Sequence, residues 1–225
     1  WVIEDDFANG RPEWERVGVQ MVPSVEPYEE AKIRILNGSH SCIAWAGTLA
    51  GMRFIHEGAR APAIRKLAYA YITDDVIPCL DRVGAPSPVD LPSYRDVVLE
   101  RFGNEAVRDT NQRVAMDAFS KIPGFIAPTV RERLAAGQSI ASVAVLPALF
   151  LGFLQRWHAG ALPYAYQDQA MDPVAAHAIC SAQDAVAAFC ADGSLWNELA
   201  GDARLADAVR QATHRHAALI AGSAQ

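Results

Sequence analysis

The sequence predicts a mostly α-helical protein. The prediction rests on several long segments with a helical pattern, on prolines that suit helix starts, and on a single short β-prone stretch, VGVQMV at 17–22. The chain has 225 residues, of which 51% are apolar and 20% charged, a composition typical of a folded globular protein. This length is enough for one compact helical unit with a sizeable core.

We divide the chain into an inter-domain segment, residues 1–26, and a helical domain, residues 27–225. In the first segment Asn9-Gly10 and Pro12 mark a turn, and VGVQMV forms a short strand. The chain opens with WVIEDDFANG, without Met and without a signal-peptide pattern, so we expect it to be the later part of a longer polypeptide.

The helical domain opens at Pro27, because proline suits the first turn of a helix, and its first helix extends to about Met52. Ser93, with Asp96 three residues on, is a variant of the capping box and predicts a helix start. The prolines of the 84–92 segment predict a rigid loop before it. Further helices are expected at about 60–83, 93–102, 109–121, 128–136, 140–159, 173–191 and 202–221.

The longest apolar run, VAVLPALFLGFL at 143–154, is predicted to be a core helix. A membrane-spanning helix needs about 20 apolar residues, which is more than this run offers. The four cysteines, Cys42, Cys79, Cys180 and Cys190, form no CxxC pair, which favours free thiols and a cytoplasmic setting.

Charge and motifs exclude several classes of function. The net charge is −6 and no Lys/Arg cluster is present, so we expect neither nucleic acid nor a membrane as partner. No GxGxxG, P-loop or HExxH pattern occurs. We interpret His214 and His216 as a solvated surface pair, and the remaining histidines outside the first helix, His56, His158 and His177, as lone structural residues.

The stretch KIRILNGSH, residues 32–40, places polar groups among aliphatic ones in the first helix. At about 100° per residue, Glu29, His40 and Asn37 lie within about 140° of Lys32, on an arc shared with Leu36. A lysine desolvated there would lose pKa and serve as a proton acceptor, while an amide and an imidazole N–H would hold an oxygen that gains negative charge. An alcohol needs this set while it loses a hydride to a nicotinamide.

Two other features of this helix bear on the interpretation. Gly38 in mid-helix suggests that a ligand or another backbone approaches closely. From spacing alone, however, the same face also fits an amphipathic helix with a snorkelling lysine and a hydrogen-bonded histidine.

Longer stretches of the sequence resemble a known protein family. YEEAKIRILNGSHS at 28–41 resembles the K-x4-N-x2-H signature of the polyol-specific long-chain dehydrogenases, the mannitol dehydrogenase family. RDTNQRVAMDAFSKIPGF at 108–125 and WVIEDDF at the start are similar to the same family. The resemblance covers essentially the whole chain. It implies a multi-helix C-terminal substrate domain of a two-domain dehydrogenase whose N-terminal Rossmann domain is absent from this chain.

The resemblance implies a role for each matching residue. Lys32 would be the general base, Asn37 one of two oxyanion-binding asparagines, and His40 the residue that orients the reacting oxygen. Glu29 would pass the proton to solvent. Arg113 and Lys121 match cationic positions of the second motif and would bind substrate, although an arginine paired with Asp109 or Asp117 and a helix-terminal lysine would look the same.

Partners follow from the same resemblance. The cofactor would be NAD, bound mainly by the missing N-terminal domain, and no metal would be needed. IRILNGSHSCIAWAGTLAG and YRDVVLERFGN are most like the branch of the family that oxidises D-arabinitol, with D-xylulose as product. We expect the isolated chain neither to bind the cofactor well nor to turn over.

Three other functions stay open at this point. Within the family they are mannitol 2-dehydrogenase and a hexuronate reductase. Binding a uronate carboxylate would require an additional arginine, because a guanidinium holds a carboxylate with two hydrogen bonds. On a helical wheel Arg34 lies about 200° from Lys32 and so points away from it. Arg53 is not excluded. Outside the family, the chain could be a non-catalytic helical interaction module.

Overall fold

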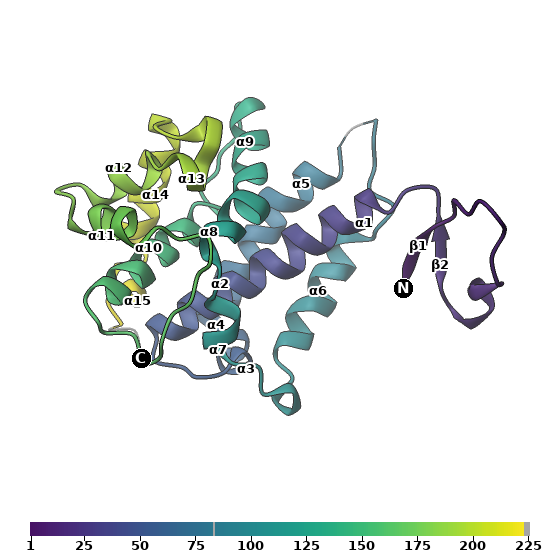
Figure 1. The fold of residues 1–225 in the computed structure, drawn as a ribbon, viewed down its shortest axis with the longest axis horizontal. Coiled ribbons are helices and arrows are strands. Elements are labelled where there is room, and N and C mark those ends of the chain that lie inside the picture. The colour runs from purple at the N-terminus through teal and green to yellow at the C-terminus, as the bar shows by residue number, and fades with distance from the viewer. Residues whose placement is uncertain (83, 223–225) are drawn as a thin grey trace.

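The computed structural model describes residues 1–82 and 84–222 and is mostly helical, as predicted. Figure 1 shows an N-terminal arm carrying β1 and β2, set apart from a helical body that α1, η2 and α2 cross as one continuous stretch. Of the arm's two strands, β1 (Val2–Glu4) was not expected. The strand predicted at 17–22 is present only as β2 (Gln20–Val22), because Val17 ends a 3-10 turn and Gly18 after it is left-handed. The two strands pair in parallel, with Val2 opposite Gln20. A left-handed Gly10 lies in the predicted turn.

The first predicted helix is present but is not a uniform α-helix. It consists of α1 (Glu26–Ala31), a π-helical turn η2 (Lys32–Asn37) and α2 (Gly38–Leu49). The segment predicted at 60–83 is likewise α4 (Pro62–Ala70), a second π turn η3 (Tyr71–Val76) and α5 (Ile77–Leu80), and its last predicted residue lies outside the described residues. Regular spacing in the sequence gave no sign of either π turn.

The helix predicted at 93–102 exists, but its predicted start is wrong. Helix α6 spans Leu91–Phe102, and its N-cap is Asp90, whose carboxylate accepts a hydrogen bond from the Ser93 amide at 3.1 Å. The Ser93 hydroxyl donates to the same carboxylate and so belongs inside the first turn. A capping carboxylate three residues before the serine outcompetes the serine as the cap.

Three other predicted helices are divided in two. The 109–121 segment forms α7 (Asn111–Ala115) and α8 (Ala118–Lys121), because Asp117 between them is left-handed, with φ +56°. The 173–191 segment forms α11 (Pro173–Ser181) and α12 (Ala185–Cys190), and Asp184 caps the second. The 202–221 segment forms α14 (Ala203–Arg215) and α15 (Ala217–Ile220).

The remaining helices complete the body. The predictions at 128–136 and 140–159 correspond to α9 (Ala127–Ala135) and α10 (Val145–His158), and α10 starts five residues late because a turn precedes it. Several short elements were not expected. They are α3 (Ile55–Arg60), α13 (Gly193–Trp196), a third π turn η5 (Ile122–Ile126), and the 3-10 turns η1 (Trp14–Val17), η4 (Glu105–Val107) and η6 (Asn197–Leu199).

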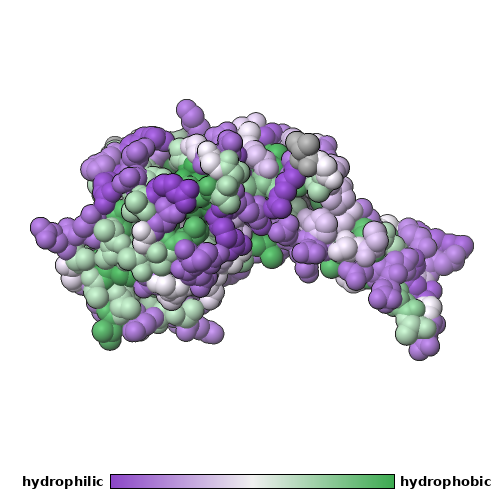
Figure 2. Space-filling view, turned by 90° about the horizontal axis from the view of Figure 1, so that it is seen from above, coloured by the Kyte–Doolittle hydropathy of each residue, from purple (hydrophilic) through white to green (hydrophobic). Residues whose placement is uncertain are grey.

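The core lies where α2 packs against α7, α10, α3 and α4. Every residue of α10 from Val145 to Leu154 is buried, so the apolar run is a core helix as predicted. Around it Trp45, Phe150 and Phe189 form aromatic contacts with ring centroids 5.1 to 6.1 Å apart. On the face that Figure 2 shows, hydrophilic residues alternate with areas of hydrophobic ones.

The thiols are free, as expected. Cys42, Cys79 and Cys190 are buried and Cys180 is partly buried. Among the described residues no helix combines the length and the hydropathy that crossing a membrane requires.

Candidate active site

Helix packing around α2 is set by two glycines. A Cβ on Gly38 would meet the side chain of Tyr71 on η3, with ring carbons at 3.0 Å, and a Cβ on Gly47 would meet Asn111 Nδ2 at 2.6 Å. The Tyr71 hydroxyl lies there because it donates to the Arg34 carbonyl at 2.8 Å. The close approach inferred from Gly38 is therefore real, but its partner is a tyrosine side chain of this chain, not a ligand or a backbone.

The π turn changes which residues share a face. A π turn closes a hydrogen bond between residues i and i+5. Asn37 therefore lies about one turn after Lys32, instead of about 140° away from it as in a regular α-helix. Such turns occur frequently at functional sites. The sequence wheel, drawn for a regular α-helix, misplaced this pair because nothing in the residue pattern marks the extra residue in the turn.

Lys32 and Glu29 are exposed in this structure, in contrast to the desolvated lysine that the sequence led us to expect. The buried charge of this stretch is Arg34 instead. Its guanidinium pairs with Glu30 at 2.9 Å and with Glu132 of α9 at 2.7 Å, so the polar group that needs partners inside the protein has them.

Four of the six residues singled out from the sequence converge on one cavity. It has a volume of about 180 Å³ and lies between α2, α7 and the α8–η5 segment. Its lining consists of Asn37, His40, Ser41, Arg113, Val114, Lys121 and Phe125. The side-chain amide, imidazole, guanidinium and amine offer several hydrogen-bond donors within a small space, which suits a ligand that carries several hydroxyl groups.

His40 is a neutral imidazole in this environment. Burial lowers the pKa of His40 to about 4, the Asp109 carboxylate opposes the shift, and Arg113 and Lys121 add to it. Its Nε2 lies 3.4 Å from Asp109 Oδ2 but is not aligned for a hydrogen bond, and its ring stacks on Phe102 with centroids 4.3 Å apart. A fixed neutral ring of this kind can orient a hydroxyl without carrying charge.

Arg113 and Lys121 are both held by local partners. The Arg113 guanidinium forms a two-bond pair with Asp109, with Nε to Oδ1 at 2.7 Å, which is one of the two pairings considered from the sequence. Lys121 Nζ donates to the Val114 carbonyl at 2.7 Å. Burial holds the pKa of Lys121 below its usual value, and Arg113 lowers it further, while Asp117 opposes the shift.

Asp109 is the residue that the sequence analysis missed. It lies beside both His40 and Arg113, and its pKa is lowered chiefly by the hydrogen bond from Arg113. Its spacing of four residues from Arg113 was noted only as an alternative explanation for the arginine. Ser41 and Phe125, which also line the cavity, carried no signal in the sequence.

Two of the histidines taken as lone residues have each other as partner. His158 Nδ1 and His177 Nδ1 are 2.7 Å apart, and the His177 ring stacks on Trp157. The prediction was wrong because these residues lie on α10 and α11, which meet only in the folded chain. Across residues 1–82 and 84–222, no three His, Cys, Asp or Glu side chains are grouped as a metal would require.

Comparison with known proteins decides the family. Residues 24–217 match the model of the mannitol dehydrogenase C-terminal domain. The chain belongs to the mannitol dehydrogenase family. Two of its relatives are D-arabinitol 4-dehydrogenases: that of Ralstonia nicotianae is 64% identical over 93% of this chain, and that of Klebsiella pneumoniae is 55% identical over 90%. The chain spans 44% of the length of each, so it corresponds to less than half of these enzymes.

Solved structures agree with this family membership. The mannitol 2-dehydrogenase of Pseudomonas fluorescens, in a ternary complex with NAD and D-mannitol, matches 99% of this chain with a TM-score of 0.82 and 32% identity, over 45% of its own length. A substrate-free D-sorbitol dehydrogenase matches the whole chain with a TM-score of 0.83 and 30% identity, over 46% of its own length. The mostly helical fold is that of the C-terminal domain of these larger enzymes.

Proposed function

We propose that an intact protein containing this chain is an NAD-dependent dehydrogenase that oxidises a secondary alcohol of D-arabinitol to give D-xylulose. This chain would bind the polyol and move its proton. The observation that carries the proposal is the cavity that gathers Asn37, His40, Arg113 and Lys121, in a chain that is 64% identical to a D-arabinitol 4-dehydrogenase. Donors of this kind can hold an oxygen that gains negative charge while a base takes its proton.

The residues of this chain do not fit NAD by themselves. The described residues hold one two-stranded sheet, and the sequence has no GxGxxG turn for a pyrophosphate. We therefore propose that NAD is held mainly by an N-terminal domain of the intact protein. We further propose that the reaction needs no metal. When bound, NAD supplies the acceptor for the hydride.

The proton would move through Lys32. As a free amine it takes the hydroxyl proton while the C–H bond breaks, and the oxygen becomes the ketone oxygen of the product. Asn37, one turn along the π helix, donates to that oxygen, and neutral His40 orients it. Glu29 passes the proton to solvent. We propose that a covering domain desolvates Lys32, whose side chain is exposed in this chain.

The cavity favours a neutral polyol over a uronate. A D-mannonate oxidoreductase of Escherichia coli is 39% identical over 69% of this chain, so the uronate alternative has a relative to support it. Of the described residues that line the cavity, however, Arg113 alone is an arginine, and its fork already holds Asp109. Arg34 is committed to Glu30 and Glu132, and Arg53 lies over the Phe54 ring. Mannitol remains an alternative substrate.

The proposal is tested with the intact protein by following NADH formation on D-arabinitol, D-mannitol, D-sorbitol and D-altronate. D-arabinitol should be the best substrate, and a chelator should leave the rate unchanged. Lys32→Ala should lower kcat by at least about 100-fold, the usual range for loss of a general base. A small external amine should restore part of the rate.

A matched variant separates the two lysines. Lys121→Met should raise the KM for the polyol and keep the rise of the oxidation rate with pH, whereas Lys32→Ala should lose that rise. If Lys121→Met instead abolished the pH dependence and Lys32→Ala kept it, Lys121 would be the base. If no polyol or uronate were oxidised, the alternative of a helical interaction module would replace the enzyme.

A further inference from the structure

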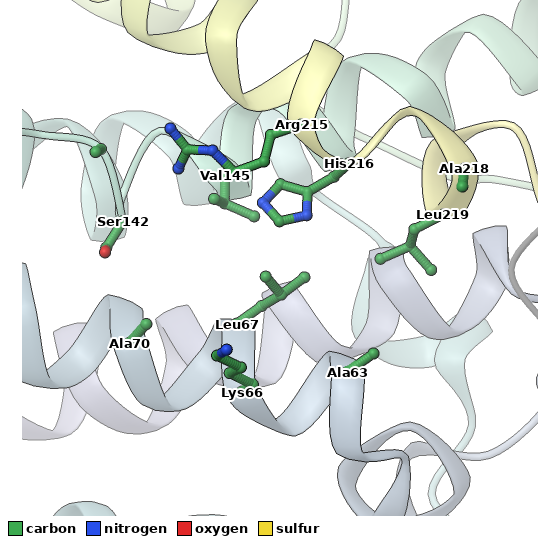
Figure 3. A pocket seen from close by; sticks show the side chains of 11 residues that line it. Ala63, Lys66, Leu67, Ala70, Ser142, Val145, Arg215, His216, Ala218 and Leu219 are labelled. Carbon is green, nitrogen blue, oxygen red and sulfur yellow. The ribbon is translucent and has the colours of Figure 1, made fainter.

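A second cavity lies away from the candidate active site and shares no lining residue with it. It has a volume of about 450 Å³ and lies between α4, the start of α10 and the corner where α14 meets α15. Figure 3 shows Leu67 on α4 facing Arg215 and His216 at the end of α14, with Leu219 beside them. A space of this size suits a small molecule better than a protein segment.

The floor of this cavity is apolar. Leu67, Val145 and Leu219 form it together with several alanines, whereas the candidate active-site cavity is lined mostly by polar side chains. Apolar lining gives no hydrogen bonds to the hydroxyl groups of a polyol. The ligand class is therefore different from that of the proposed substrate.

The rim of this cavity is cationic. Lys66 and Arg215 line it, and neither forms an ion pair with any residue that the structure describes. By contrast, Arg204 and Arg210 on the same helix pair with Asp202 and with Asp184. A nearby acid, Asp74, accepts a hydrogen bond from Ser142 at 2.7 Å. In a chain of net charge −6, two unpaired cations over an apolar floor favour an anion.

We propose that this cavity binds a small amphiphilic carboxylate, with its apolar body against Leu67, Val145 and Leu219 and its carboxylate held by Arg215 and Lys66. An arginine fork matches a carboxylate in shape and charge. A purely polar anion such as phosphate would leave the apolar floor in water, and a neutral apolar alcohol would leave the two cations without a partner.

The first test is calorimetric titration of the intact protein with octanoate, octanol and inorganic phosphate. Octanoate should bind at least about tenfold more tightly than either other probe, because a charge-assisted hydrogen bond is added to apolar burial. Equal binding of octanoate and octanol, tighter binding of phosphate, or no octanoate binding up to about 10 mM would overturn the proposal.

Variants test whether octanoate binds at this cavity. Arg215→Gln should weaken octanoate binding about tenfold or more and leave octanol binding unchanged. Arg210→Gln removes the same charge from the same helix but outside the cavity, and should leave octanoate binding unchanged. Ala63→Phe, at an exposed position on the wall, should block octanoate and octanol alike, with thermal melting to confirm folding. Equal losses in the two arginine variants, or octanoate binding that survives Ala63→Phe, would contradict the assignment.

Discussion

His40 shows how much the surroundings of one side chain change its chemistry. The same imidazole would have a pKa near 6.5 in the unfolded chain and has one of about 4 when folded, because burial disfavours its charged form. The neighbouring Asp109 carboxylate opposes this fall in pKa only in part, since Arg113 already holds that carboxylate. His40 can thus stay neutral at the edge of a cavity that also contains two cationic residues.

We expect His40 to make stability depend on pH. A depressed folded pKa means that the unfolded state binds more protons between about pH 6.5 and 4, so stability is complete above 6.5 and falls as the pH drops through this window. The loss should reach up to about 3 kcal/mol at the low end. Denaturant unfolding at a series of pH values should show a steeper fall for the wild type than for His40→Asn. Equal slopes would contradict the lowered pKa.

At the scale of elements, contacts between helices explain the glycine at position 38 and hold the π turn in place. Gly38 lets the Tyr71 ring lie against the first helix, where its hydroxyl reaches the Arg34 carbonyl. The same stretch places Arg34 against Glu132 of α9. Together these contacts fix η2 between η3 and α9, and with it the relative positions of Lys32 and Asn37.

Gly38→Ala should destabilise the fold by about 1–3 kcal/mol, because the added methyl group overpacks the contact with Tyr71. Gly124→Ala is the matched control, since Gly124 lies in another π turn and nothing would lie within 4 Å of its Cβ. Its effect should stay within about 1 kcal/mol. Thermal or denaturant unfolding measures both. The effect of Gly38→Ala should shrink in a Tyr71→Phe background, and equal effects of the two glycine variants would contradict the close contact.

At the scale of the whole molecule, this chain corresponds to less than half of its curated relatives. Its candidate site presents several hydrogen-bond donors, while its only sheet within residues 1–82 and 84–222 is a two-stranded pair on the N-terminal arm, far simpler than a dinucleotide-binding fold. Binding the substrate and binding the cofactor are therefore proposed to be divided between two domains.

A direct consequence is that the 225-residue chain alone should not bind NADH tightly and should not oxidise D-arabinitol. A fluorescence titration should show no saturable NADH binding up to about 1 mM, the weak end of ordinary ligand affinities. The intact protein, titrated in parallel, is the control and should saturate. Micromolar affinity of the isolated chain would show that it holds the cofactor by itself.

Much of the fold could be predicted from the sequence because helix signals are local. Apolar spacing and the positions of prolines gave most helices within a few residues, and the apolar run at 143–154 gave the core helix α10. The predicted helix boundaries were wrong where an aspartate sets the actual boundary. Asp90 caps α6, Asp117 separates α7 from α8, and Asp184 starts α12, each through its side chain or a left-handed backbone.

The sequence by itself determined the family and the residue types of the candidate site, because two motifs lie in continuous stretches. Only the tertiary structure decided which of those residues meet. It brought Asn37, His40, Arg113 and Lys121 to one cavity, left Lys32 and Glu29 exposed, and added Asp109. The physical reason is that the meeting of α2 with α7, the pairing of His158 with His177 and the contact of His40 with Asp109 all join residues that lie far apart in the chain.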